Sequence, residues 1–232
     1  MKSILIFLLS LVCLQATAGD DPKALIRELN RKFNLVNDYT ASLYMKFDVP
    51  GVKLSSMHGR VLFKRPNKFR IKAKGIFFLP KQNPMQQVSS MLLDTSAYTT
   101  VISGYELLNG KSCAIVNIIP VKNDQELVLG KFWIDTKNIL ILKSQMTSRN
   151  NGTIETLSEY GANSTYALPD KMTIQIEMKK MKVPKMMAVD LNKKSKEVVD
   201  PNKLEKGRID LFFTNYNINT RLSDDEFKET KE

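Results

Sequence analysis

The chain has 232 residues, a formal net charge of +11 at pH 7, and two cysteines, Cys13 and Cys113. A length of this order is enough for one sizeable hydrophobic core in a single domain. Two cysteines are too few for an extracellular module held together by several disulfides, so the core must supply the stability.

Residues 1–18 have the features of a secretory signal peptide. A positively charged start is followed by an apolar run and then by small residues up to Ala18. This pattern predicts cleavage after Ala18 and a single exported domain over residues 19–232. The apolar run is too short to span a bilayer comfortably. Cys13 offers a lipid-attachment site as an alternative, although the residue before it is poor for that processing.

Basic charge is concentrated in two parts of the chain. Residues 49–93 contain nine Lys or Arg and no Asp or Glu, and residues 179–208 contain ten basic and four acidic residues. Such charge is typical of nucleic-acid binding, but an exported protein meets little nucleic acid, so an anionic membrane surface is the preferred partner. A solvated strand face is an equal alternative. Residues 183–206 are predicted to form a basic loop of undefined role.

The predicted domain opens with an amphipathic helix that ends near Asn37. Asp21 suits the N-cap and Pro22 the first helical position. One stripe of the helix is apolar, and its members are Leu25, Ile26, Leu29, Phe33 and Val36. A helix of this kind needs an apolar surface on which to lie.

From Thr40 onward the apolar residues recur with a period of two, which indicates strands with one dry and one wet face. The candidate strands are residues 41–49, 59–80 around a turn, 98–108, 112–120, 128–135, 139–148, 154–161, 171–183 and 207–219. Short turns such as Asn109-Gly110-Lys111 separate many of them. The pattern predicts a mainly β protein with a largely antiparallel meander of about ten to eleven strands.

Two short helical segments accompany the strands. Pro84 fits a helix start, and four apolar residues then recur at helical spacing: Met85, Val88, Met91 and Leu92. This face either covers a cavity as a lid or fills one end of the core. Near the C-terminus, Ser223 and Glu226 form a capping-box pattern that predicts a short terminal turn.

The stretch 59–80 alternates with one exception. The apolar residues at every second position, which would share one face of the strands, are Val61, Phe63, Phe69, Ile71 and Phe77. By the same count Arg65 falls on this apolar face, although it lies within the predicted turn of residues 65–68. Its guanidinium either points to solvent or faces the apolar side, where it needs a hydrogen-bonding partner.

The sequence contains no recognisable catalytic constellation. His58 is the only histidine, and Cys113 lies in an apolar strand where a buried thiol is expected. No ligand cluster for zinc, phosphate-binding glycine loop or nucleophile elbow is found. We therefore expect a protein that is not an enzyme and uses no metal or cofactor. Clustering of His58 with Cys113 in a cleft would revive an enzymatic function.

A single sheet of about ten strands must cover its apolar face. A curled sheet that two short helices cover only in part leaves an apolar cavity, and such a cavity suits acyl chains. We assign the apolar residues of the stretch 59–80 to this cavity, and the apolar face of the 84–92 segment to its lid. The alternative is that the protein's own side chains fill the cavity.

Three segments resemble the outer-membrane lipoprotein carrier (LolA-like) family: KRPNKFR at 64–70, GKFWID at 130–135 and TNYNIN at 214–219. The resemblance implies an unclosed antiparallel half-barrel whose concave apolar face is covered by helices. It implies a monomeric periplasmic carrier that takes acylated lipoproteins from an inner-membrane transporter to an outer-membrane receptor. It also implies that Arg65 is a latch, which contacts the lid helices in the closed form.

Two functions remain open within this resemblance. The first is a soluble carrier of lipoproteins or a related lipid, and the second is a periplasmic lipid-sensing protein of the same fold that clamps a membrane partner. Asp94-Thr95 replaces an Asp-Gly turn usual in the family, and the basic loop 183–206 is an addition. Both departures leave the cargo undefined.

Overall fold

The structure is a computed structural model that describes residues 21–50, 56–73, 84–122, 126–149, 152–179 and 204–228. The predicted signal peptide, Phe77 and most of the predicted basic loop lie outside these residues. The last three residues of that loop, 204–206, are described, and they begin the final strand rather than ending a loop.

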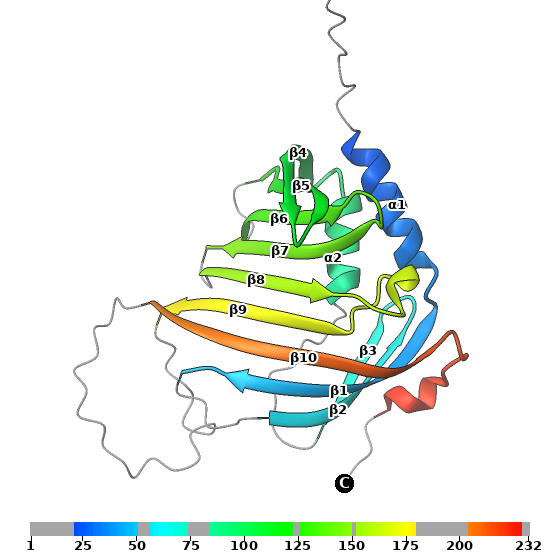
Figure 1. Cartoon of the computed structure of the whole chain (residues 1–232). Coiled ribbons are helices and arrows are strands. Elements are labelled where there is room, and N and C mark those ends of the chain that lie inside the picture. The colour runs from blue at the N-terminus through cyan, green and yellow to red at the C-terminus, as the bar shows by residue number, and fades with distance from the viewer. Residues whose placement is uncertain are drawn as a thin grey trace, which may run out of the picture.

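One antiparallel sheet of ten strands dominates the described part of the chain (Figure 1), in the order β3-β2-β1-β10-β9-β8-β7-β6-β5-β4. The strands are β1 (Asp38–Asp48), β2 (Ser56–Lys64), β3 (Lys68–Ala73), β4 (Tyr98–Leu108), β5 (Lys111–Pro120), β6 (Leu127–Asp135), β7 (Leu140–Ser148), β8 (Gly152–Glu159), β9 (Lys171–Lys179) and β10 (Leu204–Ile218). Strand β10 pairs with β1 and thereby joins the first three strands to the rest. Because β3 and β4 end the sheet, it is not closed, and the predicted half-barrel is confirmed.

Two α-helices accompany the sheet, α1 (Pro22–Asn34) and α2 (Pro84–Leu93). Figure 1 shows α1 along one side of the sheet and α2 behind β7, β8 and β9. Helix α1 begins as predicted, with the Asp21 carboxylate accepting a hydrogen bond from the Lys23 amide at 2.9 Å. None of the helices in the described ranges is both long and apolar enough to be a membrane span.

Two short 3₁₀ helices complete the described elements, η1 (Ser164–Tyr166) and η3 (Asp224–Phe227). Ser223 is the N-cap of η3, and its hydroxyl accepts a hydrogen bond from the Asp225 amide at 3.3 Å. The terminal turn predicted from the capping-box pattern is therefore confirmed.

Three groups of packed apolar side chains occur in the described residues: a small one around Cys113 and Trp133, and two larger ones that occupy different parts of the sheet. The first of the larger two, which we call the hairpin cluster, lies on β1 and β2 with contributions from nearby loops; its buried members are Val36, Tyr39, Ala41, Leu43, Met45, Met57, Val61, Phe63 and Leu168. The second, the helix cluster, joins α1 and α2 to β5, β6 and β7; its buried members are Ile26, Leu29, Leu92, Val116, Ile118, Phe132, Ile134 and Ile141. Helix α1 is thus an integral part of the core.

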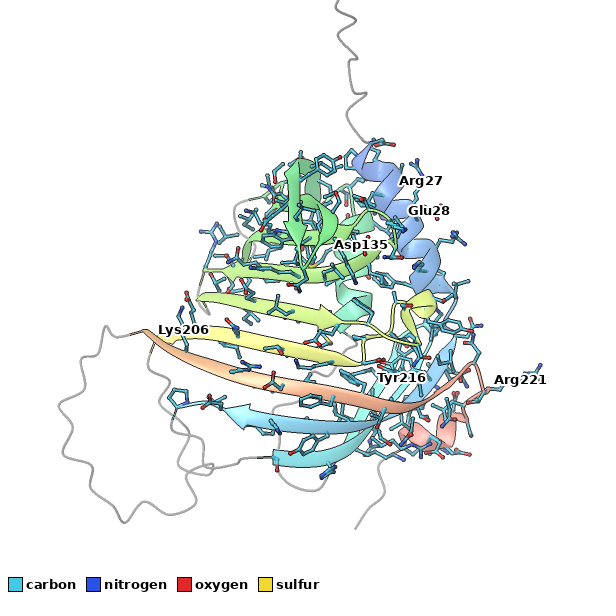
Figure 2. The ribbon with its side chains drawn as sticks, viewed as in Figure 1. Arg27, Glu28, Asp135, Lys206, Tyr216 and Arg221 are labelled. Carbon is cyan, nitrogen blue, oxygen red and sulfur yellow. The ribbon has the colours of Figure 1, made fainter. Side chains whose placement is uncertain are left out.

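The turn between β6 and β7 is organised by a buried carboxylate. Asp135, labelled in Figure 2, is 1% exposed and accepts hydrogen bonds from the Lys137 and Asn138 amides at 2.9 and 3.0 Å. The Asn138 side chain donates a further bond at 2.8 Å. Burial raises the pKa of Asp135, but the hydrogen bonds from Asn138 and Lys137 outweigh burial and leave the pKa lowered.

Candidate functional site

Strands β8 and β9 lie between the two clusters, and the strand register shows which of their side chains face the concave side. Met146 packs against the helix cluster. It pairs with Ile154 of β8, which in turn pairs with Ile176 of β9. Because paired residues of an antiparallel sheet share a face, Ile154 and Ile176 lie on the concave side with Met146.

The strands on the other side of β9 also show which of its side chains face the concave side. Leu211 of β10 packs against the hairpin cluster and pairs with Met172 of β9. Ile174 lies between Met172 and Ile176 at a spacing of two residues, so all three point to the concave face. The two derivations start from opposite clusters and agree.

These side chains form an apolar surface that is incompletely covered, which we call the central floor: Ile154, Met172, Ile174 and Ile176. Ile154 is 36% exposed, and the other three are half-buried. Aliphatic side chains in the middle of a concave sheet are ordinarily fully buried in a core. The central floor therefore offers apolar surface that a ligand would remove from water at roughly 25 cal/mol per Å².

The residues predicted to line the cavity lie to one side of this floor. Val61 and Phe63 are 1% and 5% exposed within the hairpin cluster. Phe69 and Ile71 are half-buried and pack against the same cluster, each opposite its partner on β2. These four residues come together as predicted, but they contact mainly each other and β1, so their contact with a ligand stays a prediction.

The predicted lid residues lie on the other side of the floor. Leu92 is 3% exposed in the helix cluster, and Val88 and Met91 are half-buried against it. Met85 belongs to α2, but its side chain lies outside the described part. The structure thus brings the lid residues together with α1 and β5–β7, and it separates them from the predicted cavity residues by β8 and β9.

Arg65 points toward the protein and contacts helix α1. Its Nε donates a hydrogen bond to the Val36 carbonyl at 2.7 Å, and its Nη2 donates one to the Phe33 carbonyl at 2.5 Å. Its backbone amide also donates to the Asn37 carbonyl at 2.8 Å. These carbonyls belong to the end of α1 and the segment after it, where backbone acceptors lack helical partners. Burial of the guanidinium lowers the pKa of Arg65.

A second cation fastens α1 at its last turn. Lys32 Nζ donates hydrogen bonds to the Asn138 carbonyl at 2.5 Å and to the Ser164 carbonyl at 3.5 Å. The first of these lies in the β6–β7 turn and the second in η1. Arg65 and Lys32 therefore fix the C-terminal end of α1 to two separate parts of the sheet.

The sequence analysis did not identify the central floor or Lys32 as parts of the site. The signal for the floor was present, because Met172, Ile174 and Ile176 alternate within the predicted strand 171–183. What was missing is the strand order, which places β9 between two packed clusters. Lys32 carried no distinguishing signal, since it lies on a helix with other charged residues.

His58 and Cys113 do not form a catalytic pair. His58 is exposed on β2 and stacks on Tyr44 with ring centroids 4.7 Å apart. Cys113 is fully buried on β5, and burial is the largest cause that raises the pKa of its thiol. Strands β2 and β5 are separated by six others in the sheet.

Surface hollows occur elsewhere in the described part of the molecule. One of about 600 Å³ lies around Tyr44, His58 and Phe212, and another of about 400 Å³ lies between the β2–β3 turn and Phe227. Tyr44 alternates with Leu43 and Met45 of the hairpin cluster, so its ring lies on the convex face. These hollows are separate from the central floor.

No protein-family model and no curated protein sequence matches the chain. Its structure is similar to a domain described as an outer membrane lipoprotein-sorting protein from Vibrio parahaemolyticus, with a TM-score of 0.57 and 11% identity over 90% of this chain and 97% of that one. A LolA superfamily protein from Nitrosomonas europaea gives a TM-score of 0.51 and 9% identity, over 88% and 97% of the two chains. A DUF1329 family protein from Desulfovibrio piger gives 0.54 and 11%, over 89% and 95%.

The fold is LolA-like. At identities this low, the similarity establishes the arrangement of strands and helices and leaves individual residue roles to be tested. The LolA-like half-barrel of this chain presents the central floor on its concave face, where a ligand would meet aliphatic side chains from β8 and β9.

Proposed function

We propose that this protein is a soluble periplasmic carrier that binds the acyl chains of a lipoprotein, or of a related lipid, on the concave face of its half-barrel. The observation that carries the proposal is the central floor, an aliphatic surface left partly exposed between two packed clusters. The LolA-like fold supports the same ligand class, because one similar structure is described as a lipoprotein-sorting protein.

The chemistry of the floor suits an acyl chain. Ile154, Ile174 and Ile176 offer branched aliphatic surface, and each methylene buried against them would contribute roughly 0.8 kcal/mol. Thr156 and Ser144 are paired with each other in the row that continues from Ile174, so the face is not uniformly apolar. Acyl chains, which need no polar partner, are therefore expected along the isoleucine rows.

We expect α1 and α2 to play different parts when a ligand enters the concave face. Helix α1 is fastened by Arg65 and Lys32 through hydrogen bonds to backbone carbonyls. Helix α2 contributes apolar side chains to the helix cluster, with Leu92 as its buried member. We propose that α2 is the part that moves when ligand enters, and that Arg65 acts as a latch by holding α1, on which α2 packs.

The proposal extends to transport in the cell envelope. Residues 1–18 would direct export and residues 19–232 would act as one carrier domain. Cargo would come from an inner-membrane transporter and pass to an outer-membrane receptor, as the LolA-like resemblance implies. Transfer would follow the relative affinities of these partners for the acyl chains.

Displacement of a fluorescent apolar dye from the protein without residues 1–18 tests acyl binding. A triacylated peptide should displace the dye, and the same peptide without acyl chains should leave it bound. Equal displacement by both peptides, or by neither, would contradict acyl binding on this protein.

A pair of neighbouring substitutions tests where the acyl chains bind. Ile174→Glu places a charge on the central floor, whereas Gln175→Glu places the same charge on the exposed opposite face of β9. The first variant should lose most of its dye and acyl-peptide binding because a carboxylate must be buried against the chain. The second should bind like the unmodified protein, and equal behaviour of the two variants would exclude the floor.

A further inference from the structure

Four cationic side chains on the outer face of the β2–β3 hairpin, Lys64, Lys68, Arg70 and Lys72, contact the C-terminal segment of the chain. Lys64 and Lys68 both contact the Asp224 carboxylate, with N–O distances of 2.7 and 2.6 Å. Lys72 contacts Glu226 at 3.2 Å. We call residues 222–228, which contain these carboxylates, the acidic strap.

The hairpin also binds the backbone of the acidic strap. Lys64 Nζ donates a hydrogen bond to the Leu222 carbonyl, and Arg70 Nη1 donates one to the Phe227 carbonyl, both at 2.8 Å. Phe227 borders the hollow of about 400 Å³ that Lys68 and Arg70 also line. The surface therefore recognises two carboxylates and two backbone carbonyls.

The Asp224 carboxylate of the strap is held in the ionised form. Hydrogen bonds from Lys64 and Lys68 lower the pKa of Asp224 to about 2. Both partners of each ion pair keep about a third or more of their side-chain surface exposed, so each pair is worth little and exchanges readily with water.

The strap is short, and Asp38 fixes the chain at its start. Asp38 accepts hydrogen bonds from the Thr220 and Arg221 amides at 2.9 and 3.2 Å, which fixes the chain just before the strap. Figure 2 shows Arg221 at the outer end of the loop between β10 and η3. Beyond this point the strap contributes a single 3₁₀ turn, and a single turn has little stability of its own.

We propose that the outer face of the β2–β3 hairpin is a docking site for an acidic peptide segment of a partner protein, and that the acidic strap occupies this site until the partner replaces it. The strap defines the ligand: acidic residues two positions apart, followed by an aromatic residue. Since this surface lies on the opposite face from Val61, Phe63 and Phe69, docking is independent of acyl binding on the concave floor.

The contacts favour a peptide over an anionic membrane as the occupant. Lipid phosphates would satisfy the lysines, but they supply no equivalent of the Leu222 and Phe227 carbonyls, which Lys64 and Arg70 bind. A surface built for a membrane would need charge without this spacing.

Full-length variants without residues 1–18 test the docking site. The double variant Asp224→Asn, Glu226→Gln removes the strap's ion pairs with the hairpin. Asp225→Asn is the matched control, because Asp225 pairs with Lys228 inside the strap. The probe is a fluorescent peptide of sequence LSDDEFK, with LSNNQFK as its neutral counterpart, and binding is followed by anisotropy at low and moderate salt.

The double variant should bind LSDDEFK roughly tenfold more tightly than the unmodified protein and the Asp225→Asn control, since two or three exposed ion pairs no longer compete. Binding should weaken with salt, disappear with LSNNQFK, and weaken several-fold when Lys68→Gln is added to the double variant. Equal affinity in all proteins, or no binding in any, would overturn the proposal. So would binding of the double variant to vesicles of anionic lipid without binding to LSDDEFK.

Discussion

Arg65 joins the β2–β3 turn to the end of α1. It lies at a turn, yet its guanidinium serves the carbonyls of Phe33 and Val36 rather than solvent. Replacing it removes two charge-assisted hydrogen bonds; the Phe33 carbonyl keeps the Val36 amide as a donor, whereas the Val36 carbonyl loses the guanidinium. The consequence should be felt in stability as well as in ligand release.

Arg65→Leu should lower the free energy of unfolding by about 1–3 kcal/mol, the range for leaving partly buried polar groups unsatisfied. Arg60→Leu is the matched control, because Arg60 lies exposed on β2 of the same hairpin with only a long hydrogen bond, 3.4 Å, to the Thr40 hydroxyl; this variant should change stability by less than about 0.5 kcal/mol. Urea denaturation measures both. If Arg65 is a latch, dye release should also be faster in Arg65→Leu than in Arg60→Leu. Equal stability and equal dye release in the two variants would contradict the latch role of Arg65.

Asp135 makes stability depend on pH in a defined direction. Its pKa in the folded protein is lowered, because the hydrogen bonds from Asn138 and Lys137 outweigh the opposing effect of burial. A lowered folded pKa means that Asp135 stabilises the protein above the unfolded value of about 3.9, and that this contribution is lost as pH falls through the folded pKa. The β6–β7 turn should therefore weaken in acid.

Asp135→Asn should be less stable than the unmodified protein at pH 7, and the difference should shrink below about pH 4. Thermal or urea unfolding across pH 2.5–7, chosen to cover roughly this range, measures the difference. Asp225→Asn controls for the loss of one carboxylate at an exposed site. A difference that stays constant with pH would show that the hydrogen bonds do not depend on the charge of Asp135.

At the scale of elements, α2 joins the rest of the protein through one side of the helix. Leu92 is 3% exposed in the helix cluster, whereas the next residue, Leu93, is 46% exposed. Leu92→Ala should lower stability by about 2–5 kcal/mol, and Leu93→Ala should have an effect of about 0.5 kcal/mol or less. Chemical denaturation compares them directly, and similar losses would mean that α2 does not pack as described.

Local patterns predicted most of these elements because each element is specified by nearby residues. Asp21-Pro22 starts α1, and Asn109 and Gly110, both with positive φ, form the turn between β4 and β5. The pairing of β1 with β10 is different, since it joins residues more than 150 positions apart in the sequence. No local pattern encodes that pairing, and it decides where the central floor lies.

Long-range packing also explains why the site residues were only partly predicted. Phe63 and Leu92 were both correctly expected on the apolar side, but periodicity cannot tell whether two apolar residues belong to one cluster. Arg65 was expected to meet a helix, and its partner is the C-terminal end of α1 rather than the predicted lid segment. Its acceptors are backbone carbonyls, which leave no trace in the pattern of side chains.

At the scale of the whole molecule, the half-barrel combines a packed cluster at each side with a less covered centre. The hairpin cluster and the helix cluster stabilise the two sides, and α1 and the segment after it link them through Leu29 and Val36. The central floor can therefore stay partly exposed without loss of the fold. A molecule arranged in this way can bind an apolar ligand and remain folded when the ligand leaves.

The most direct test of acyl binding is a titration of methyl-labelled isoleucine in the protein with a triacylated peptide, followed by NMR. The methyl signals of Ile154, Ile174 and Ile176 should shift, whereas that of Ile115, which packs beside Trp133 in a separate cluster, should not. The peptide without acyl chains should shift none of them. Shifts at Ile115 with an unchanged central floor would contradict the carrier mechanism described here.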